Sequence, residues 1–323
     1  MSMLFSSDID YLGKWFKARV ELGVDDTIML GKVNLNSGLV DWMQYSHREF
    51  DGVGVMAHAL EANGYPQQEM PISRHQRPAW YKLIGSTLNI FGSQRPLSTQ
   101  WKVKEPVADN SVMYPAWRVL SAKEKAGIDR YSKEQGVSTN AYLFWCLNKV
   151  VATSLIKSNS DFTWFYPTNM RGPFIKSNRY GNHSSGVYIN SDSDIDLTAF
   201  SERCKDQLRE NRHWGLLIQG HLGTLFGDRV VRRLYSQAST KRVYAGSYSA
   251  LGKWPRSAAA IENEVWVICA PGSPSYPVST GVIEWGESVT FCLKLHPSIV
   301  GGHKADLQRD TLDLWMEEVL AGV

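Results

Sequence analysis

The segment His47-Arg48-Glu49-Phe50-Asp51-Gly52 decides the fold prediction, because it joins two stretches of different periodicity. Before it, residues 39–45 read Leu-Val-Asp-Trp-Met-Gln-Tyr, an apolar run in partial alternation that predicts a strand. After it, apolar residues recur at helical spacing until Asn63-Gly64, a pair that is typical of a helix end. The sequence therefore predicts strand, polar loop and helix, with His47 and Asp51 in the loop.

A second copy of this arrangement lies near the C-terminus. Residues 289–295 predict a strand that runs into His296-Pro297-Ser298-Ile299-Val300-Gly301, and a helix is predicted over 304–320. Both segments share the His, the Gly five positions later and the strand-loop-helix setting. The position before the Gly is Asp51 in the first copy and Val300 in the second. We therefore predict two related lobes, of which only the first keeps His and Asp together.

Composition sets outer limits on the function. The 323 residues are 43% apolar and 21% charged, which is typical of a globular protein with a sizeable core, and the net charge is +3. The basic residues are scattered, so no stripe indicates nucleic-acid binding. The four cysteines form no CxxC pair, which argues against zinc ribbons and favours reduced cytosolic thiols. The N-terminus lacks the pattern of a signal peptide, and no apolar run is long enough to span a membrane. We expect a cytoplasmic protein.

The remaining pattern mixes strands and helices. Residues 1–36 suggest a helical or irregular opening segment, and residues 65–114 a connection that contains a short helix near 80–91. Ser121 and Glu124 form a capping-box pattern for a helix ending near Gly136, and Ser138 or Thr139 can cap an apolar helix over 141–155. Helical periodicity also covers 198–235, and Pro167 to Gly172 indicates a turn. Further strands are predicted at 117–120, 161–166, 184–189, 242–248, 265–269 and 280–285. The irregular order favours a mixed-sheet α/β fold.

The HxxxDG spacing and the segments around it resemble a known superfamily of acyltransferases. Chloramphenicol acetyltransferase, plant BAHD acyltransferases, peptide-synthetase condensation domains and wax ester synthases share HxxxDG on such a loop, and two-lobed members keep it in the first lobe only. The resemblance spans residues 39–320, and the pattern is most similar to the two-lobed wax ester synthases and condensation-type members. Further segments that resemble the family are Gly136-Val137-Ser138-Thr139-Asn140, Pro167 to Arg171, Tyr180-Gly181-Asn182 and Ser247-Tyr248-Ser249.

The resemblance implies a chloramphenicol acetyltransferase-like mixed-sheet sandwich. Residues 1–110 would form a reduced N-terminal lobe with the motif and a connecting segment, and residues 111–323 a full C-terminal lobe with the degenerate copy. The chain departs from the family in three respects. Only 46 residues precede His47, Ser46 stands where many relatives have a second His, and the plant DFGWG motif is missing. A partner subunit could supply the missing first-lobe sheet, so a homo-oligomer is one expectation.

The activity that the resemblance implies is transfer of an acyl group from a CoA or acyl-carrier-protein thioester to a hydroxyl or amine of a small molecule. His47 would act as general base without an acyl-enzyme, and no permanently bound cofactor is expected. Asp51 would hold the loop through a salt bridge, with Arg171 as the first partner and Arg19 as a weaker one. Gly52 would allow a tight turn and a close approach of substrate. Ser249 or Ser247 would donate to the oxyanion.

Other interpretations of these residues stay open at this point. The protein could be a non-catalytic relative that binds an acyl chain, a carrier protein or a partner subunit, because a shortened lobe encloses a thioester less well. The same His could also support thioester hydrolysis if water enters the site. His47 and Asp51 could both ligate a metal, but no third ligand stands at a suitable spacing, so no metal site is predicted. His58, His183 and His296 are predicted to be structural.

Overall fold

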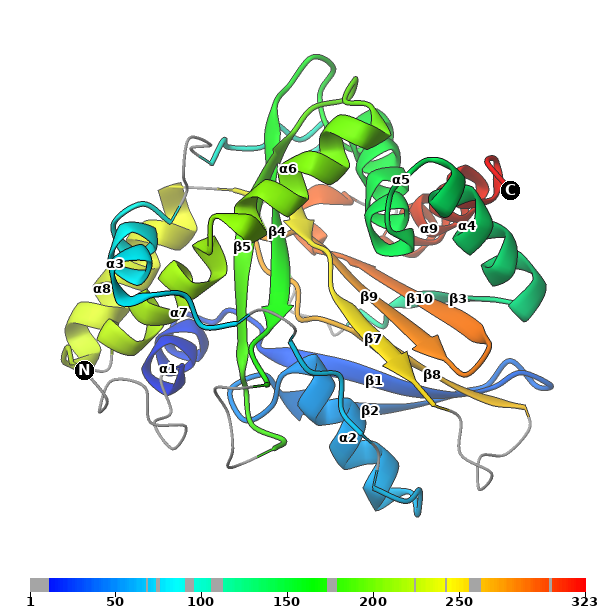
Figure 1. The fold of residues 1–323 in the computed structure, drawn as a ribbon, viewed down its shortest axis with the longest axis horizontal. Helices are drawn as coiled ribbons and strands as arrows, with labels where there is room; N and C mark the ends of the chain where they lie inside the picture. Colours follow the sequence, from blue (N-terminus) through cyan, green and yellow to red (C-terminus); the bar gives the residue numbers. More distant parts are fainter. Residues whose placement is uncertain are drawn as a thin grey trace.

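The structure is a computed structural model. It describes residues 12–67, 69–73, 76–90, 96–105, 113–172, 179–223, 225–241, 243–255, 263–301 and 304–323. Within these residues the strands form two sheets, and helices pack around them (Figure 1). This arrangement confirms the predicted mixed α/β fold.

The bounds of the elements are as follows. The helices are α1 (Gly13–Glu21), α2 (Gly52–Ala62), α3 (Trp80–Leu88), α4 (Ala122–Glu134), α5 (Thr139–Ser154), α6 (Leu197–Arg209), α7 (Arg212–Gly223), α8 (Asp228–Lys241) and α9 (Lys304–Leu320), with a 3-10 turn at Pro297–Ile299. The strands are β1 (Thr27–Asn34), β2 (Val40–Ser46), β3 (Ala116–Leu120), β4 (Phe162–Asn169), β5 (Ser184–Ser191), β6 (Gly246–Ser247), β7 (Ala250–Trp254), β8 (Glu264–Cys269), β9 (Val278–Trp285) and β10 (Ser288–Leu295).

The larger sheet has the strand order β3-β10-β9-β6-β4-β5, and β7 also pairs with β9. Helices α5, α6 and α9 lie over one of its faces (Figure 1). Phe144 of α5 is central to the core there, because its ring stacks on Tyr248 at 4.3 Å and meets Trp164 edge-on. The apolar helix predicted over 141–155 is therefore buried on several sides, as expected.

The smaller sheet has the order β2-β1-β8, and α2 packs against it. Its strand β1 was not predicted, since residues 1–36 were expected to be helical or irregular. The strand lies inside the core, so four consecutive residues are buried and the alternation that marks a half-exposed strand is lost. Gly31 also interrupts the apolar run. A Cβ at this position would lie 2.7 Å from the side chain of Val40, so glycine allows the close pairing of β1 with β2.

Strand β8 joins the two parts of the chain. It pairs antiparallel with β1, with Met29 opposite Cys269, and it also lies against β9 and β10 of the larger sheet. The sheets approach closely at Gly281, where a Cβ would lie 1.9 Å from the carbonyl oxygen of Ile268. The third strand of the small sheet thus comes from the same chain, and a partner subunit as the source of further first-lobe strands stays a prediction.

Several local predictions are confirmed and others are wrong. Ser121 and Glu124 form the capping box, and Ser138 caps α5. The predicted turn over 167–172 is wrong in its first half, because β4 continues through Pro167 to Asn169. Proline fits there because β6 is only two residues long, which leaves β5 as the partner of β4 at that position.

The C-terminal half also differs from the predictions in detail. The helical region predicted over 198–235 is three helices, α6 to α8. The strand predicted over 242–248 is reduced to β6, and β7 was not predicted. In the part of the chain that the structure describes, no helix combines the length and apolarity needed to cross a membrane.

Candidate active site

The predicted motif forms a turn between β2 and α2. The backbone N–H of His47 donates to the carbonyl of Asp26 at 2.8 Å, which fixes the end of the β1–β2 hairpin. Asp51 has extended backbone angles and caps α2, since its Oδ1 accepts from the N–H of Gly54 at 2.8 Å. The Asp51 residue is only 4% exposed. The capping bond explains locally why the helix begins at Gly52.

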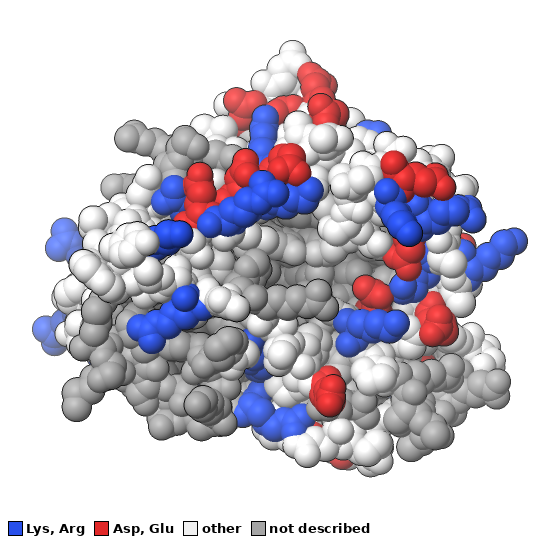
Figure 2. Space-filling view, in the orientation of Figure 1, with Lys and Arg blue, Asp and Glu red and all other residues white. Residues whose placement is uncertain are grey.

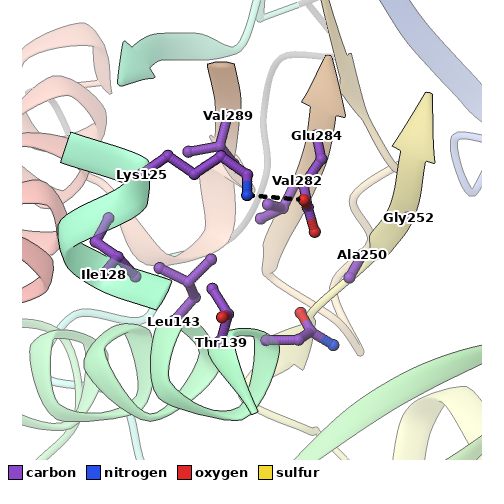
Figure 3. Close-up of a pocket in the computed structure, with 10 residues that line it drawn as sticks. Lys125, Ile128, Thr139, Leu143, Ala250, Gly252, Val282, Glu284 and Val289 are labelled. Carbon is purple, nitrogen blue, oxygen red and sulfur yellow. Dashed lines mark ion pairs between the residues drawn. The ribbon is translucent and has the colours of Figure 1, made fainter. Parts of the chain in front are cut away.

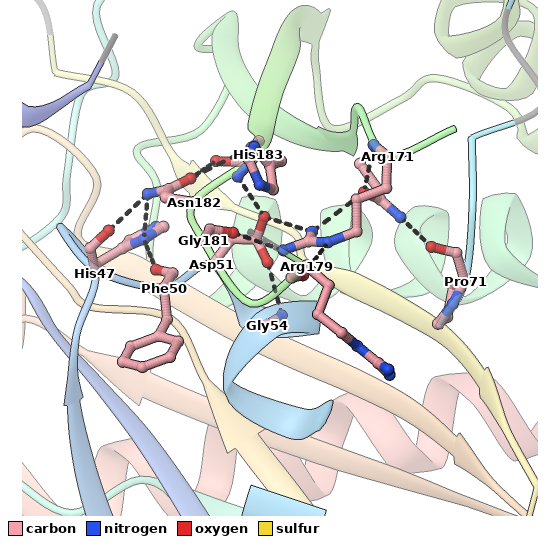
Figure 4. Close-up of polar contacts among 12 residues, drawn as sticks. His47, Phe50, Asp51, Gly54, Pro71, Arg171, Arg179, Gly181, Asn182 and His183 are labelled. Carbon is pink, nitrogen blue, oxygen red and sulfur yellow. Dashed lines mark hydrogen bonds and ion pairs between the residues drawn. The ribbon is translucent and has the colours of Figure 1, made fainter. Parts of the chain in front are cut away.

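The predicted ion pair between Asp51 and Arg171 is present. Arg171 Nη1 donates to Asp51 Oδ2 at 2.7 Å, and both side chains are about 95% buried. The same Oδ2 accepts from the backbone N–H of His183 at 2.7 Å (Figure 4). Arg19, the weaker candidate, donates to the carbonyl of Asp25 instead. Asp51 therefore joins the first motif to a segment more than 100 residues later in the chain.

Arg171 is itself held by the loop of residues 179–183, called here the 179–183 loop. Its Nε donates to the carbonyl of Arg179 at 3.0 Å and its Nη2 to the carbonyl of Gly181 at 2.6 Å (Figure 4). These bonds and the Asp51 carboxylate together engage Nε, Nη1 and Nη2 of the guanidinium. The buried ion pair fixes the position of Arg171 strongly, because loss of the Asp51 carboxylate would leave the guanidinium charge buried and uncompensated.

Asn182, in the 179–183 loop, contacts His47 directly. Its Nδ2 donates to the His47 carbonyl at 2.6 Å and lies 3.0 Å from His47 Nδ1. Its Oδ1 accepts from the N–H and the hydroxyl of Ser184, which sets the orientation of the amide. Sequence reasoning did not name Asn182 as a site residue. The sequence did contain the Gly181-Asn182 pair before a strand. That pair alone does not indicate that Asn182 contacts the first motif.

The His47 ring is oriented by the backbone of its own loop. Nδ1 lies 2.9 Å from the carbonyl oxygen of Phe50, an acceptor, so we assign the neutral tautomer in which Nδ1–H donates to that carbonyl. Nε2 then carries the free lone pair. The ring of Phe16 packs at 4.9 Å from the half-buried imidazole.

Its surroundings keep His47 neutral. Burial lowers the pKa of the His47 imidazole, and the positive charge of Arg19 lowers it further. The hydrogen bond to Phe50 and the charge of Asp51 oppose this effect without reversing it. At neutral pH the ring is therefore a base able to accept a proton.

Gly52 of the motif and Gly54 just after it allow neighbouring segments to pack closely against α2. Gly52 lies outside the left-handed region, so the turn into α2 does not require a positive φ at this position. A Cβ at Gly52 would lie 2.4 Å from the side chain of Leu251 in β7, so its small size brings α2 against that strand. Gly54, which the sequence analysis did not name as a site residue, is packed even more closely, because a Cβ there would lie 1.9 Å from the carbonyl oxygen of Tyr180.

The candidate oxyanion donors, Ser247 and Ser249, lie around the β6–β7 junction. The register pairs Ser247 with Phe165 and Ser279, on the face opposite the one where Tyr248 stacks on α5. Leu251 lies on the same face as Ser247, because the two positions differ by an even number of residues. Its side chain lies next to Gly52, so this face is the one nearer to the motif. Ser247 is buried and Ser249 half-buried. No hydrogen bond between either serine and His47 is found in the described part of the chain, so their role stays a prediction.

A cavity of about 180 Å³ lies on the other side of β7, between that strand, α4, α5, β9 and β10 (Figure 3). Figure 2 shows a hollow near the middle of the corresponding face, with basic and acidic side chains interspersed around it. No continuous basic stripe is visible on this face. Among the described residues, no group of three His, Cys, Asp or Glu side chains is arranged to hold a metal ion.

Comparison with known proteins identifies the fold. No family profile matches the sequence, and no curated protein matches it. Solved structures do match, at low identity. The cyclization-docking bidomain of the EpoB nonribosomal peptide synthetase from Sorangium cellulosum aligns with a TM-score of 0.57 and 13% identity, over 87% of this chain and 59% of that one. The trichothecene 15-O-acetyltransferase from Fusarium sporotrichioides aligns with a TM-score of 0.53 and 12% identity, over 88% and 66%.

A third match shows the breadth of this fold. The epimerization domain from the third module of tyrocidine synthetase B aligns with a TM-score of 0.51 and 11% identity, over 87% of this chain and 68% of that one. The chain therefore has the fold of condensation-type domains and chloramphenicol acetyltransferase-like acyltransferases, as predicted. It spans about three fifths to two thirds of the length of these neighbours.

Proposed function

We propose that this chain, which has the fold of condensation-type domains, is an acyltransferase. It would move an acyl group from a CoA or carrier-protein thioester to a hydroxyl or amine of a small molecule. The observation that carries the proposal is the double attachment of the motif. Asp51 is bound to Arg171 and Asn182 is bound to His47, so that a neutral imidazole is held with Nδ1 engaged and with no partner of Nε2 among the described residues.

The proposed reaction needs one base and one oxyanion donor. Nε2 of His47 takes the proton from the acceptor O–H or N–H while the acceptor atom attacks the thioester carbonyl carbon. The carbonyl becomes a tetrahedral oxyanion, which the hydroxyl of Ser249 or Ser247 stabilises by donating a hydrogen bond. Collapse breaks the carbon–sulfur bond, and the departing thiolate recovers the proton from the imidazolium. The products are an ester or amide and a free thiol, and no acyl-enzyme forms.

Asp51 takes no proton in this scheme. Both of its oxygens accept hydrogen bonds from protein donors, namely the Gly54 N–H, the His183 N–H and Arg171 Nη1. Its task is to hold the loop against the 179–183 loop, and through it to set the position of the His47 ring. Asp51 is thus a positioning residue, and Gly52 acts through packing against Leu251.

The experiment that tests the proposal compares His47→Ala with His58→Ala. His58 lies on α2, where its ring packs against Phe50 at 5.3 Å, and it has no role in the scheme. Thiol release and product mass are measured with acyl-CoA and with an acyl carrier protein as donors, and with a panel of alcohols and amines. We expect His47→Ala to lose about 10²–10⁴-fold in kcat/KM with little change in melting temperature.

The outcomes separate the alternatives. Ester or amide product that depends on His47 supports acyl transfer, whereas free acid alone supports thioester hydrolysis. A folded wild-type protein that releases no thiol with any donor would favour a binding module. Comparing the two donors decides between CoA and a carrier protein, the kind of partner suggested by the peptide-synthetase names of two neighbours. A cytoplasmic location and a homo-oligomer belong to the same proposal, and sedimentation measures the latter.

A further inference from the structure

Helix α3 presents apolar side chains to solvent instead of to the core. Within about 100° around its axis lie four exposed large apolar residues, Trp80, Tyr81, Ile84 and Leu88. The other side of the helix packs on α7, where Leu83 is buried and a Cβ at Gly215 would lie 2.2 Å from the carbonyl oxygen of Ser86. A surface helix normally directs its apolar stripe at the core, so α3 is turned the opposite way.

Helix α8 and the loop before it expose a second group of apolar side chains. Leu225 and Phe226 precede the helix and are 66% and 46% exposed. Val230 and Leu234 are also exposed, and they lie one turn apart on the same side of α8. The helix packs on α1, and Val231 is buried. The second apolar group therefore continues from the loop onto the exposed side of α8.

Both groups lie at one end of the molecule, called here the α3–α8 end. Helix α3 packs on α7, and α1 packs on both α7 and α8. Figure 1 shows these helices together at the left, away from α4 and α9. In the described part of the chain, eight of the seventeen exposed large apolar side chains belong to α3 or to residues 225–234. Exposed apolar residues that are concentrated in this way mark an interaction surface.

The α3–α8 end also carries unpaired positive charge. The segment 212–241 has five basic residues and a single acidic residue, Asp228. Asp228 pairs with Lys17 of α1, and two of the arginines pair with glutamates outside the segment. Arg229 and Arg233 are exposed, lie one turn apart beside the apolar residues of α8, and form no ion pair with any described residue. Their charges are therefore available to an anionic partner.

This combination of residues suits an anionic lipid surface. Tryptophan and tyrosine favour the level of the lipid headgroups, and the apolar side of a basic amphipathic helix enters the boundary between headgroups and acyl chains. Arginines beside that apolar side attract anionic headgroups. A second copy of the chain fits less well, because a two-fold contact through this end would place Arg229 and Arg233 against the same basic surface.

We propose that the α3–α8 end docks the protein on the surface of a bilayer that contains anionic lipid. The helices would lie on the bilayer without crossing it. This docking does not depend on the acyl transfer proposed above.

The test measures sedimentation of the full chain with vesicles. One set of vesicles is phosphatidylcholine, and the other contains about one third phosphatidylserine. We expect the protein to sediment with the anionic vesicles and to bind the neutral ones at least tenfold more weakly. Raising the salt concentration from about 0.1 M to about 1 M should weaken binding to the anionic vesicles, because salt screens exposed charges.

The charge contribution is tested by the double variant Arg229→Gln/Arg233→Gln. Each arginine near an anionic surface contributes about fivefold in affinity, so we expect binding to weaken about 25-fold and to depend less on salt. The matched control is Arg130→Gln/Lys133→Gln, which removes two exposed charges from α4. The control should bind the anionic vesicles like the wild type.

The apolar contribution is tested by Leu225→Ser/Leu234→Ser. Because two exposed leucines would leave the lipid, binding should weaken at least tenfold while its salt dependence stays. The matched control is Leu39→Ser/Leu314→Ser, which removes two leucines that are exposed on other parts of the surface. All four positions are exposed, so melting temperatures should change little.

Trp80 reports the contact of α3 with lipid. Brominated acyl chains quench tryptophan fluorescence at short range, so anionic vesicles that contain them should quench the wild-type protein. Trp80→Phe should remove most of this quenching, because Trp80 is 64% exposed on the docking helix.

Several results would overturn the inference. It is wrong if the protein does not sediment with anionic vesicles, or if both double variants bind like their controls. It is also wrong if the same variants abolish self-association or binding of an acidic carrier protein while vesicles do not bind, because the surface would then serve a protein. Failure of the acyltransferase proposal looks different. In that case no thioester is turned over, while vesicle binding and its loss in the two variants remain.

Discussion

Two hairpins of this molecule end in a histidine that is held in the same way. After β1 and β2, the N–H of His47 donates to the carbonyl of Asp26, the residue before β1, at 2.8 Å. After β9 and β10, the N–H of His296 donates to the carbonyl of Pro277, the residue before β9, at 2.7 Å. The internal similarity read from the sequence is therefore visible in backbone contacts.

The two loops diverge after the histidine. Asp51 bonds to Arg171 and to the backbone of His183, so the first loop is attached to the 179–183 loop. At the corresponding position, Val300 is buried in the core. His296 turns back on its own loop, where Nδ1 accepts from the N–H of Ser298 at 3.2 Å and starts a 3-10 turn.

The difference shows what each residue contributes. The hairpin alone is sufficient to place a histidine at the end of the sheet. The residue four positions later decides whether the loop is attached to a distant part of the chain or packed into its own core. In the proposed reaction His47 is the base and Asp51 holds its loop, and the following substitutions test both parts of this comparison.

The largest effect is expected from Asp51→Val, which gives the first loop the residue of the second. Arg171 would then be a buried charge without its carboxylate, and the free energy of unfolding should fall by about 3–5 kcal/mol. Urea denaturation measures this. The reciprocal Val300→Asp should also destabilise the fold, because it buries a carboxylate in an apolar core. Stability unchanged in Asp51→Val would mean that the ion pair does not hold the loop.

Gly54 in the first turn of α2 and Gly301 in the second loop should respond differently to replacement by alanine. Gly54→Ala brings a Cβ against the carbonyl of Tyr180 in the 179–183 loop, so we expect a loss of about 1–3 kcal/mol together with reduced activity. Gly301→Ala places alanine at a φ of +58°, which should cost about 1–2 kcal/mol and leave activity intact. Thermal denaturation and thiol-release rates distinguish them. Equal loss of activity in both variants would contradict a special role for the first loop.

Asn182→Ala removes the contact between the 179–183 loop and His47 while keeping the Asp51–Arg171 pair. One hydrogen bond is worth about 0.5–1.5 kcal/mol, so we expect kcat to fall by about 2- to 13-fold with KM nearly unchanged. The ring nitrogen shifts in an NMR spectrum should show a stronger preference for the Nδ1–H tautomer, because the variant lacks an amide donor that lies 3.0 Å from Nδ1. An unchanged tautomer together with unchanged kcat would remove Asn182 from the site.

The smallest effects concern pH, where burial lowers the pKa of both histidines. Activity needs neutral His47, so the acid limb of kcat/KM against pH should have its midpoint below the ordinary histidine value of 6.5. Arg19→Met removes a charge that lowers this pKa, so the limb should move toward higher pH. A limb that moves to lower pH in this variant would contradict the assignment.

For His296, burial lowers the pKa to about 4. Between pH 6.5 and about 4 the unfolded chain binds a proton that the folded chain does not. Stability contributed by neutral His296 is therefore present above pH 6.5 and lost as pH falls toward 4. His296→Gln should flatten this part of the stability curve, as measured by denaturation at several pH values. A curve identical to the wild type would exclude His296 as its source.

The residues of the first motif could be predicted from the sequence, whereas most of the residues that contact them could not. The strand and the helix around His47 to Gly52 follow from local periodicity, whereas the roles of His47, Asp51 and Arg171 come from the resemblance to the acyltransferase superfamily. Asn182 and Gly54 could not be assigned roles, because their importance arises from contacts with residues distant in the sequence. Strand β1 was missed for a related reason: it is buried on both faces, and such strands lack alternation.

Strand β8 has a consequence for the order in which the protein is built. Residue 29 pairs with residue 269, so the small sheet is completed only by a segment from the last quarter of the chain. A chain growing on the ribosome emerges from its N-terminus, and contacts of such long sequence separation form slowly. The histidine loop is therefore made early but gains its final support late. A chain that has grown only as far as β7 therefore lacks the third strand of the small sheet.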